Sequence, residues 1–353
     1  MSEKKLSAPR ELHFTPTNGP VDKAIGDLIA QAGGIRRPRI VREMILAALK
    51  AGQEDNDDRV DLKMMNHTLK EMRFTAKVFA PYRQVRKVSV FGSARVKPDA
   101  PRYRLARELG ALLAQAGFMV ITGGGPGIMH AVNEGAGPDA SFGINIQLPF
   151  EQHPNPIVAG NPRSVNYKYF FNRKVAFLKE ADAVVLLPGG FGTLDEGMET
   201  LTLIQTGKRD PLPVVMLDLP GGSYWRRWKE FITTQLAAAG YTDAHDLAFV
   251  KFESDPKQVV AHIRAFYARY HSLRYVDDTL VVRLSSALEP RQIAALKAEF
   301  ADMLLPGGDL AAGTAFHEER DTPALLDLPR LVIDFDRRQF SRLRQCIDRI
   351  NAM

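Results

Sequence analysis

Residues 181–208 read ADAVVLLPGGFGTLDEGMETLTLIQTGK, and this stretch decides the fold. The apolar run Ala183–Leu187 predicts a buried strand, and a helix is expected from about Thr193 to Thr206, directly after a glycine-rich turn. A helix that begins there leaves backbone N–H groups unpaired, with the positive end of the helix dipole behind them. The sequence therefore predicts an anion site at this turn, for which phosphate is the usual ligand.

Two carboxylates lie on the same predicted helix. Leu194, Met198 and Leu201 recur at helical spacing, so they are expected to form its buried stripe. Glu196 and Glu199 are then expected to lie together on the opposite face. The helix would bring two acidic groups close to the anion site.

Glu196 has two interpretations from its position alone. Thr193 and Glu196 have the T-x-x-E spacing of a capping box, in which the two side chains satisfy backbone donors, and this reading is as well supported as a chemical one. Against it, two carboxylates beside a phosphate site are costly unless cations pair with them. Arg173 and Lys174, in NYKYFFNRKVAF, are the expected partners, although a helical Arg-Lys pair is often only a solvated face.

Composition limits the class of protein. The 353 residues are 45% hydrophobic and 25% charged, as in ordinary globular proteins, and the net charge of +6 is spread along the chain, so we expect no nucleic-acid partner. One cysteine, Cys346, excludes an intrachain disulfide, and the scattered histidines predict no metal site and no cofactor. The start lacks the apolar segment of a signal peptide, and no apolar run approaches the roughly 20 residues of a membrane helix. These features predict a cytoplasmic protein without a membrane partner.

Strands and helices alternate through the middle of the chain, which predicts an α/β fold with a doubly wound (Rossmann-like) parallel sheet. The expected strands are Lys87–Phe91, Phe118–Ile121, Ser141–Leu148, Ala183–Leu187, Pro213–Leu217 and Ala248–Phe252. The expected helices are Arg102–Ala116, Gly127–Glu134, Val165–Lys179, Thr193–Thr206, Tyr224–Ala238 and Pro256–Ala268.

Three parts are expected along the chain. Residues 1–84 are predicted to be an N-terminal helical extension that serves as a cap, as a dimer surface or only in core packing. Residues 85–272 are predicted to form the Rossmann-like nucleotide-binding domain. Residues 273–353 are predicted to form a small α+β appendix in the order strand–helix–strand–helix, close to half of a ferredoxin-like fold.

Three glycine-bearing turns each follow a predicted strand, at residues 91–95, 122–127 and 188–193. Each turn taken singly is weak evidence for a ligand, because a glycine after a strand often only permits a tight change of direction. In a doubly wound sheet, however, the three turns lie along the same edge and can converge on one ligand. Together they favour a nucleotide or another phosphorylated ligand.

The sequence excludes several alternatives for this ligand. The second turn, GGGPG, matches neither the dinucleotide pattern G-x-G-x-x-G nor the Walker pattern with Gly-Lys-Ser/Thr. Ser93 lacks the G-x-S-x-G context of a hydrolase nucleophile. Lys174 as a Schiff-base lysine has no supporting pyridoxal residues. Loss of the dinucleotide and Walker patterns favours a smaller ligand, such as a mononucleotide.

Five segments, in order, resemble the Lonely Guy (LOG) family, once labelled "lysine decarboxylase-like", and in particular its longer bacterial members. They are FGSAR, ITGGGPGIMHAVNEGA, GINIQLPFEQHPNP, YFFNRK and PGGFGTLDE, within about residues 70–270. The resemblance implies a phosphoribohydrolase that cuts the N-glycosidic bond of a nucleoside 5′-monophosphate, such as AMP or a cytokinin ribotide, to free base and ribose 5-phosphate. It also implies a homodimer or a dimer-based oligomer.

The resemblance further implies roles for individual residues. Arg173 and Glu196 match the family's catalytic pair. The substrate-binding positions are expected to be Gly92, Ser93, Gly124, Gly125, Lys174, Gly189, Gly190, Gly192, Thr193 and Glu199. The principal alternative is a non-catalytic carrier of a nucleotide or of molybdenum cofactor with the same fold, which need not keep the Arg-Glu pair. The sequence leaves the preferred base open.

Overall fold

The computed structural model of the chain describes residues 19–53, 59–148 and 153–353. Clustering of contacts divides the chain into two compact units, Met1–Lys70 and Glu71–Met353. The first unit contains α1, α2 and the beginning of α3, whose bounds are Pro20–Ala32, Pro38–Gln53 and Arg59–Phe79. The three-part division at residues 84/85 and 272/273 remains a prediction.

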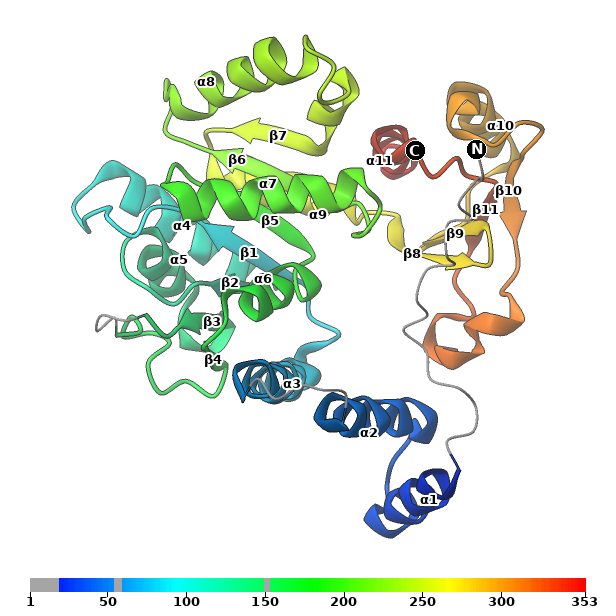
Figure 1. The fold of residues 1–353 in the computed structure, drawn as a ribbon. Helices are drawn as coiled ribbons and strands as arrows, with labels where there is room; N and C mark the ends of the chain where they lie inside the picture. The colour runs from blue at the N-terminus through cyan, green and yellow to red at the C-terminus, as the bar shows by residue number, and fades with distance from the viewer. Residues whose placement is uncertain (1–18, 54–58, 149–152) are drawn as a thin grey trace, which may run out of the picture. The chain divides into compact units, whose positions relative to one another are not determined.

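A seven-stranded parallel sheet forms the centre of the second unit (Figure 1). Its strands are β1 Lys87–Phe91, β2 Met119–Thr122, β3 Ser141–Ile146, β4 Ser164–Tyr167, β5 Ala183–Leu186, β6 Val214–Leu217 and β7 Val250–Glu253. Their order is β4-β3-β2-β1-β5-β6-β7, which confirms the predicted doubly wound sheet. The order reverses between β1 and β5. In such sheets, ligands bind in the crevice at the carboxyl ends of the strands where this reversal occurs.

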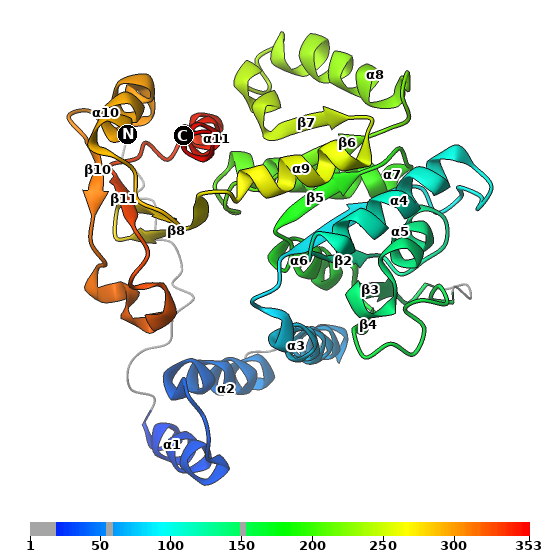
Figure 2. The same cartoon turned by 180° about the vertical axis from the view of Figure 1, so that it is seen from behind.

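Helices cover both faces of this sheet (Figures 1 and 2). One face carries α4 Pro101–Gln115, α5 Ile128–Ala136 and α9 Pro256–Phe266. The other face carries α6 Phe170–Lys179, α7 Phe191–Gln205, α8 Tyr224–Phe231 and the end of α3. Because both faces are covered, β1 and β5 are buried along their whole length, which explains the uninterrupted apolar sequence of β5.

Two predicted helices differ from the structure. The helix expected over Val165–Lys179 begins only at Phe170, because residues 164–167 pair with β3 as the edge strand β4. The helix expected over Tyr224–Ala238 is α-helical to Phe231 and continues as a π-helical turn over Ile232–Ala237. Edge pairing and a change of helix type depend on neighbouring elements, so local periodicity did not reveal them. Short 3₁₀ segments cover Ala80–Tyr82, Pro138–Ala140, Ala244–Phe249, Ala301–Met303, His317–Asp321 and Pro323–Leu325.

The C-terminal part is an antiparallel four-stranded sheet with two helices. Its elements are β8 Tyr270–Val276, β9 Thr279–Leu284, α10 Pro290–Glu299, β10 Leu310–Gly313, β11 Arg330–Ile333 and α11 Phe340–Asn351. The predicted order strand–helix–strand–helix did not include β8 or β10. The sheet order β10-β11-β9-β8 is that of a ferredoxin-like fold in which the last strand has moved to the start of the chain.

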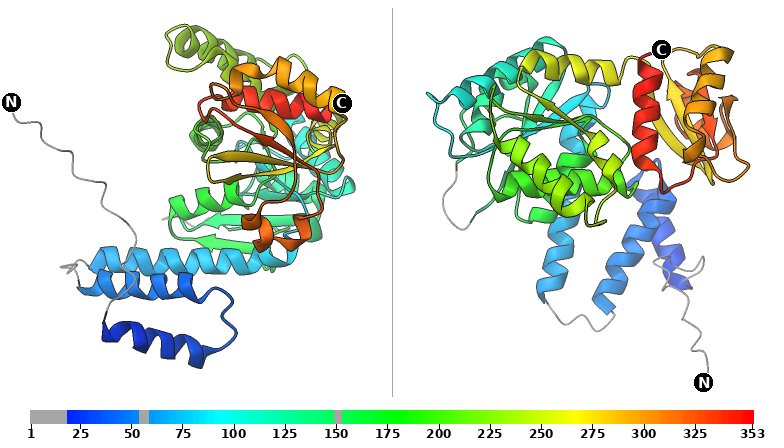
Figure 3. Two further views of the ribbon diagram at one scale, coloured as in Figure 1. Left: turned by 90° about the vertical axis from the view of Figure 1, so that its right-hand side faces the viewer. Right: turned by 90° about the horizontal axis from the view of Figure 1, so that it is seen from above.

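Helix α11 joins the C-terminal sheet to the parallel sheet (Figure 3). It contacts α7 and α9, and Arg344 Nη1 donates to the Leu212 carbonyl oxygen at 2.9 Å. The Phe340 ring lies over Gly207, where a Cβ atom would come within 2.0 Å of it. One continuous apolar core therefore includes side chains from both sheets.

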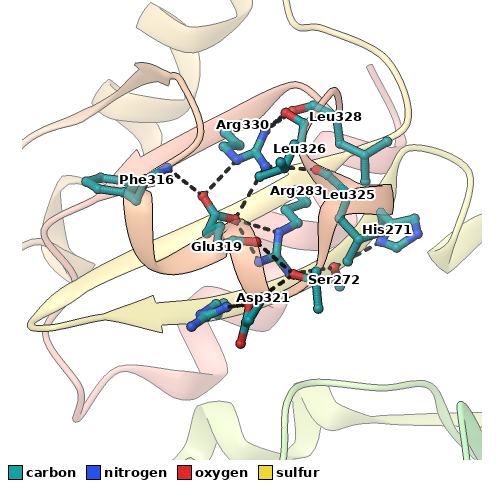
Figure 4. Close-up of polar contacts among 12 residues, drawn as sticks. His271, Ser272, Arg283, Phe316, Glu319, Asp321, Leu325, Leu326, Leu328 and Arg330 are labelled. Carbon is teal, nitrogen blue, oxygen red and sulfur yellow. Dashed lines mark hydrogen bonds and ion pairs between the residues drawn. The ribbon is translucent and has the colours of Figure 1, made fainter. Parts of the chain in front are cut away.

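A buried ion triad fixes the 3₁₀ segments onto the C-terminal sheet (Figure 4). Glu319, 1% exposed, receives Arg283 Nε at 2.8 Å on one oxygen and Arg330 Nε at 3.0 Å on the other. The remaining donors of Arg330 bind the carbonyl oxygens of Leu325, Leu326 and Leu328. Burial raises the pKa of Glu319, but hydrogen bonds from the Phe316 N–H, Arg330 and Arg283 outweigh this effect and lower it. The carboxylate is thus fully satisfied, and its role is structural.

Helices α4 and α5 pack backbone against backbone through two glycines. A Cβ atom at Gly110 would come within 2.1 Å of the Val132 carbonyl oxygen, and one at Gly135 within 1.9 Å of the Arg107 carbonyl oxygen. This close approach places α5, which follows the second glycine turn, directly on the sheet.

We expect Gly110→Ala to lower the free energy of unfolding by about 1–3 kcal/mol, because the added methyl group overpacks the contact. Helix propensity alone would raise stability by about 1 kcal/mol. Urea denaturation measures the difference. Gly26→Ala, in α1 with open space around it, is the control and should not be destabilising. A Gly110→Ala variant as stable as the wild type would contradict the packing described here.

Candidate active site

Helix α7 begins two residues earlier than predicted. Its first residue is Phe191, and its N-cap is Gly190, which offers no side-chain cap. The N–H groups of Thr193 and Leu194 donate to the Gly190 carbonyl oxygen at 3.1 and 3.2 Å. Thr193 is therefore inside the first turn, and the T-x-x-E capping box with Glu196 does not form. The capping interpretation of Glu196 was wrong, because the glycine turn enters the helix directly.

The buried face of α7 also differs from the prediction. The buried residues are Thr193, Glu196, Gly197, Thr200 and Ile204, whereas Met198 is 38% exposed. A Cβ atom at Gly197 would lie 3.1 Å from Leu186 Cδ1, so glycine allows α7 to approach β5 closely. This approach turns Glu196 toward the sheet and leaves it 5% exposed.

The turn before α7 offers backbone donors to an anion. Within the described residues, no hydrogen bond uses the N–H groups of Gly190, Phe191 or Gly192. Tyr224 Oη donates to the Gly189 carbonyl oxygen at 2.7 Å, and a Cβ atom at Gly189 would come within 2.1 Å of Thr193 Oγ1. These contacts fix a turn whose free N–H groups lie at the positive end of the helix dipole.

The first and third glycine turns meet at the reversal of strand order. The Ser93 N–H donates to the Pro188 carbonyl oxygen at 3.2 Å, and the Ile128 N–H donates to the Ser93 carbonyl oxygen at 3.0 Å. Gly92 is required beside Ile128, because a Cβ atom there would come within 2.6 Å of its side chain. The turns after β1 and β5 and the start of α5 thus form one surface.

A buried polar network holds the second glycine turn. Thr122 Oγ1 accepts from the Gly124 N–H at 3.1 Å and donates to Asn133 Oδ1 at 2.7 Å. The Asn155 N–H donates to the Gly124 carbonyl oxygen at 2.7 Å, and Asn155 Nδ2 donates to that of Gly125 at 3.1 Å. The turn after β2 is therefore rigidly placed beside the other two.

Lys174 is the cation that contacts the carboxylates of α7. Its Nζ lies 2.7 Å from Glu199 Oε2, 2.8 Å from Asp195 Oδ2 and 3.8 Å from Glu196 Oε2. Burial opposes the charge of Lys174, but the hydrogen bonds to Asp195 and Glu199 outweigh it and raise its pKa. The ammonium group is thus held in place beside Glu196 without a hydrogen bond to it.

Arg173 takes a different position. Its Nε donates to the Ile144 carbonyl oxygen at 2.9 Å, and its guanidinium lies 5.0 Å from the Phe177 ring centroid. A Cβ atom at Gly123 would come within 2.5 Å of its Nη2, so this glycine makes room for it. Burial lowers the pKa of Arg173, and Glu196 acts in the opposite direction. Among the residues described, Arg173 and Glu196 form no ion pair within 4 Å.

Glu196 is the carboxylate with the most unusual environment. Its Oε2 is buried and has no hydrogen-bond partner in the described part of the chain. Burial raises the pKa of Glu196 to about 7, although Lys174 and Arg173 oppose the shift. A carboxyl group that titrates near neutral pH in a cavity has the properties of a general acid or base.

Two adjoining cavities contain most of the predicted site residues. The larger, of about 660 Å³, is lined by Gly92, Ser93, Arg173, Gly189, Gly190, Gly192, Thr193 and Glu196 among others. The smaller, of about 200 Å³, is lined by Gly124, Gly125 and Arg173 among others. Lys174 and Glu199 line neither cavity. They form an ion pair with each other, next to Glu196.

The cavities also include residues that the sequence did not single out. Gly123, Met129 and Phe170 line both cavities, Phe191 lines the larger one, and Asn145 lines the smaller one. Asn145 carried a signal, since it is a polar residue within the apolar segment that predicted β3. Phe191 is 93% exposed and gave no signal beyond its place in the glycine turn.

Two absences apply to the described residues only. Within residues 19–53, 59–148 and 153–353, no group of three or more His, Cys, Asp or Glu side chains could hold a metal ion. In the same ranges no helix is both long and apolar enough to span a membrane.

Comparison with known proteins gives a family match and curated relatives. A family model described as "Possible lysine decarboxylase" matches residues 112–263. A cytokinin riboside 5′-monophosphate phosphoribohydrolase of Arabidopsis thaliana is 32% identical over 152 residues, which are 42% of this chain and 67% of that protein. An enzyme of the same name from Oryza sativa subsp. japonica is 34% identical over 142 residues. That match covers 38% of this chain and only 56% of the rice protein.

Solved structures of similar proteins include a molybdenum cofactor binding protein from Rippkaea orientalis. It is 21% identical to this chain, with a TM-score of 0.37, and the match covers 51% of this chain and 96% of that protein.

The raised pKa of Glu196 predicts how stability depends on pH. The folded protein binds this proton more tightly than the unfolded chain does. The stabilisation that the bound proton gives to the folded state is therefore complete below the ordinary pKa of 4.5, and it is lost as the pH rises toward about 7. Glu196→Gln resembles the protonated acid and should avoid the loss. We expect the variant to match the wild type near pH 4.5 and to exceed it by roughly 2–3 kcal/mol at pH 8.

Chemical denaturation of both proteins across this pH range measures the difference. A stability difference that does not change with pH would contradict the burial of a Glu196 carboxyl whose Oε2 lacks a hydrogen bond.

Proposed function

Because the chain belongs to the Lonely Guy (LOG) family, we propose that it hydrolyses the N-glycosidic bond of a nucleoside 5′-monophosphate to free base and ribose 5-phosphate. One observation carries the proposal: the buried carboxyl of Glu196, whose Oε2 has no hydrogen-bond partner in the described part of the chain, lines the same cavity as the free N–H groups of the glycine turn. The donors that would bind the phosphate and the titratable carboxyl group can thus contact one substrate. AMP and cytokinin riboside monophosphates are the substrates we propose.

The 5′-phosphate binds at the turn of Gly190, Phe191 and Gly192. Their N–H groups are the free donors of the helix start, and the dipole of α7 favours the dianion. Ser93 and Thr193 line the same cavity and add hydroxyl groups. Since Glu196 lies less than two turns along α7, the ribose is held across the first turn of the helix.

Glu196 acts at the anomeric carbon. Cleavage of the ribosyl C–N bond develops positive charge on the sugar, which a carboxylate stabilises. The same carboxylate accepts a proton from the attacking water, so that hydroxide adds to the anomeric carbon as the C–N bond breaks. The base leaves with the bonding electron pair and takes this proton from Glu196, which returns the carboxylate to its ionised form. With a pKa of about 7, Glu196 is partly ionised at neutral pH and exchanges protons readily.

The two cations have separate roles in this mechanism. Lys174, clamped by Asp195 and Glu199, offsets the negative charge beside Glu196 without quenching it through a hydrogen bond. Arg173 lies where the two cavities meet and contacts the ribose or the bond to the base. A homodimer in the cytoplasm is part of the same proposal, supported by the family resemblance and by the exposed Phe170, Phe171 and Val175 on α6.

The alternative is a non-catalytic carrier of a nucleotide or of molybdenum cofactor. A carrier needs the anion site, but it has no use for a buried carboxyl with a raised pKa beside that site. The environment of Glu196 therefore favours the hydrolase.

We expect Glu196→Ala to reduce release of adenine from AMP by at least about 100-fold, since it removes both charge stabilisation and proton transfer. Chromatographic assay of free base from AMP, GMP, CMP and a cytokinin riboside monophosphate measures the activity. The control is Glu108→Gln, an exposed carboxyl on α4, which should keep full activity. Normal turnover by Glu196→Ala would remove Glu196 from the mechanism, and tight binding without base release by the wild type would support the carrier.

The phosphate handle gives a second test. Adenosine should be a poor substrate, with kcat/KM reduced by about 1,000-fold or more relative to AMP, because the charge-assisted bonds to the glycine turn position the ribose. Inorganic phosphate should inhibit competitively. Equal kcat/KM values for AMP and adenosine would show that the turn does not bind the phosphate.

A further inference from the structure

The smaller cavity, beside the second glycine turn, has no role in the proposed bond cleavage. It shares Gly123, Met129, Phe170 and Arg173 with the larger cavity, so the two are continuous past the Arg173 guanidinium. The larger cavity lies at the ends of β1 and β5, and the smaller one at the ends of β2 and β3. The two cavities therefore lie side by side along the edge formed by the carboxyl ends of the strands, from β5 toward β3.

This arrangement gives a bound nucleotide its direction. The phosphate occupies the turn after β5, and the ribose lies near Glu196 in the same cavity. The base must then extend away from the phosphate, and the adjoining volume of about 200 Å³ is the space that the edge of the sheet offers. Met129 and Phe170 give this space an apolar lining of the kind that planar bases prefer.

Asn145 supplies the polar group in this space. It lies in β3, is 8% exposed and lines the smaller cavity. Its Nδ2 donates to Ser164 Oγ on β4 at 2.8 Å, and its Oδ1 lies beside Gly124, which lines the same cavity. A Cβ atom at Gly124 would come within 1.8 Å of this Oδ1, so glycine is required there. Within the described ranges Oδ1 accepts no hydrogen bond.

We propose that Asn145 determines base specificity: its fixed Oδ1 accepts a hydrogen bond from the exocyclic amino group of the nucleobase. Adenine and cytosine carry such an amino donor, whereas guanine, hypoxanthine and uracil present an oxygen acceptor at the corresponding position. An oxygen facing Oδ1 leaves both acceptors unpaired, which a partly buried site strongly disfavours. This inference rests on the proposed function and adds its substrate class, nucleotides whose base carries an amino group at C6 of a purine or C4 of a pyrimidine.

The test compares two matched pairs of nucleotides, AMP with IMP and CMP with UMP. The wild type should favour the amino member of each accepted pair by about tenfold or more in kcat/KM, mainly through KM, because the contact is remote from the bond that breaks. Asn145→Leu, close in shape but without the acceptor, should bring this ratio to within about threefold of one. Asn145→Asp keeps an acceptor and should retain the preference. If the wild type hydrolyses the AMP and IMP pair, the preferred base is adenine; if it hydrolyses the CMP and UMP pair, the preferred base is cytosine.

Two controls separate specificity from folding. Gln147→Leu replaces an exposed amide just beyond the same strand and should leave the ratios unchanged. Inhibition by ribose 5-phosphate should be equal in the wild type and in Asn145→Leu, because this product lacks a base. If Asn145→Leu fails to fold, Ser164→Ala takes its place: the Asn145 amide is then free to rotate, and the preference should decrease.

Several results would overturn the inference. They are a wild-type preference for the oxo-bearing bases, no preference, or ratios that Asn145→Leu and Ser164→Ala leave unchanged. If the wild type releases base from none of the four nucleotides, the hydrolase proposal fails instead. Calorimetry then gives the dissociation constants of the same four nucleotides. The ratios for AMP against IMP and for CMP against UMP, in the wild type and in Asn145→Leu, decide the role of Asn145.

Discussion

The position of Glu196 in α7 is the constraint on which the site depends. A carboxyl group 5% exposed and without a hydrogen bond on Oε2 is unfavourable for folding, and the raised pKa expresses that cost. The cost is imposed by the approach of α7 to β5, which Gly197 permits beside Leu186. A larger residue at 197 would move the helix away from the sheet and give Glu196 access to water. The structure thus retains a local instability at the candidate site.

The charges around Glu196 are arranged to preserve this state. Lys174 has its close contacts with Asp195 and Glu199, so it stabilises negative charge nearby while remaining 3.8 Å from Glu196. A direct, hydrogen-bonded ion pair would lower the pKa of Glu196 far below neutrality and remove its capacity to exchange protons near pH 7. Lys174, which is half of the Arg-Lys pair in the sequence, is therefore held by Asp195 and Glu199 and acts on Glu196 only from a distance. Arg173, the other half of the pair, forms part of the wall between the two cavities.

The surrounding fold holds α7 from several sides. Its beginning is fixed by the glycine turn, whose Gly189 carbonyl oxygen accepts from Tyr224 Oη. Just beyond its end, Gly207 packs under Phe340 of α11. The C-terminal sheet is thereby connected to the far end of the helix that carries Glu196, through a core shared by both sheets. The buried triad of Glu319 with Arg283 and Arg330 belongs to this supporting structure.

The sequence by itself determined the class of fold and the neighbourhood of the site. Alternation of apolar strands with amphipathic helices predicted the parallel sheet, because a strand covered on both faces must be apolar throughout. The glycine turns predicted the anion site, since helix starts after such turns leave donors free. These signals are local, so sequence spacing carries them.

Only the tertiary structure decided which side chains face one another. The spacing of Leu194, Met198 and Leu201 predicted the buried stripe of the helix. Leu194 and Leu201 are only partly buried against the core and Met198 is exposed, because the side with Glu196 and Gly197 is the one packed inward. The edge strand β4 and the position of Asn145 beside Gly124 likewise depend on neighbours distant in sequence. The burial of Glu196, its distance from Lys174 and the cavity beside Arg173 arise from the packing of separate elements, which spacing along one helix does not specify.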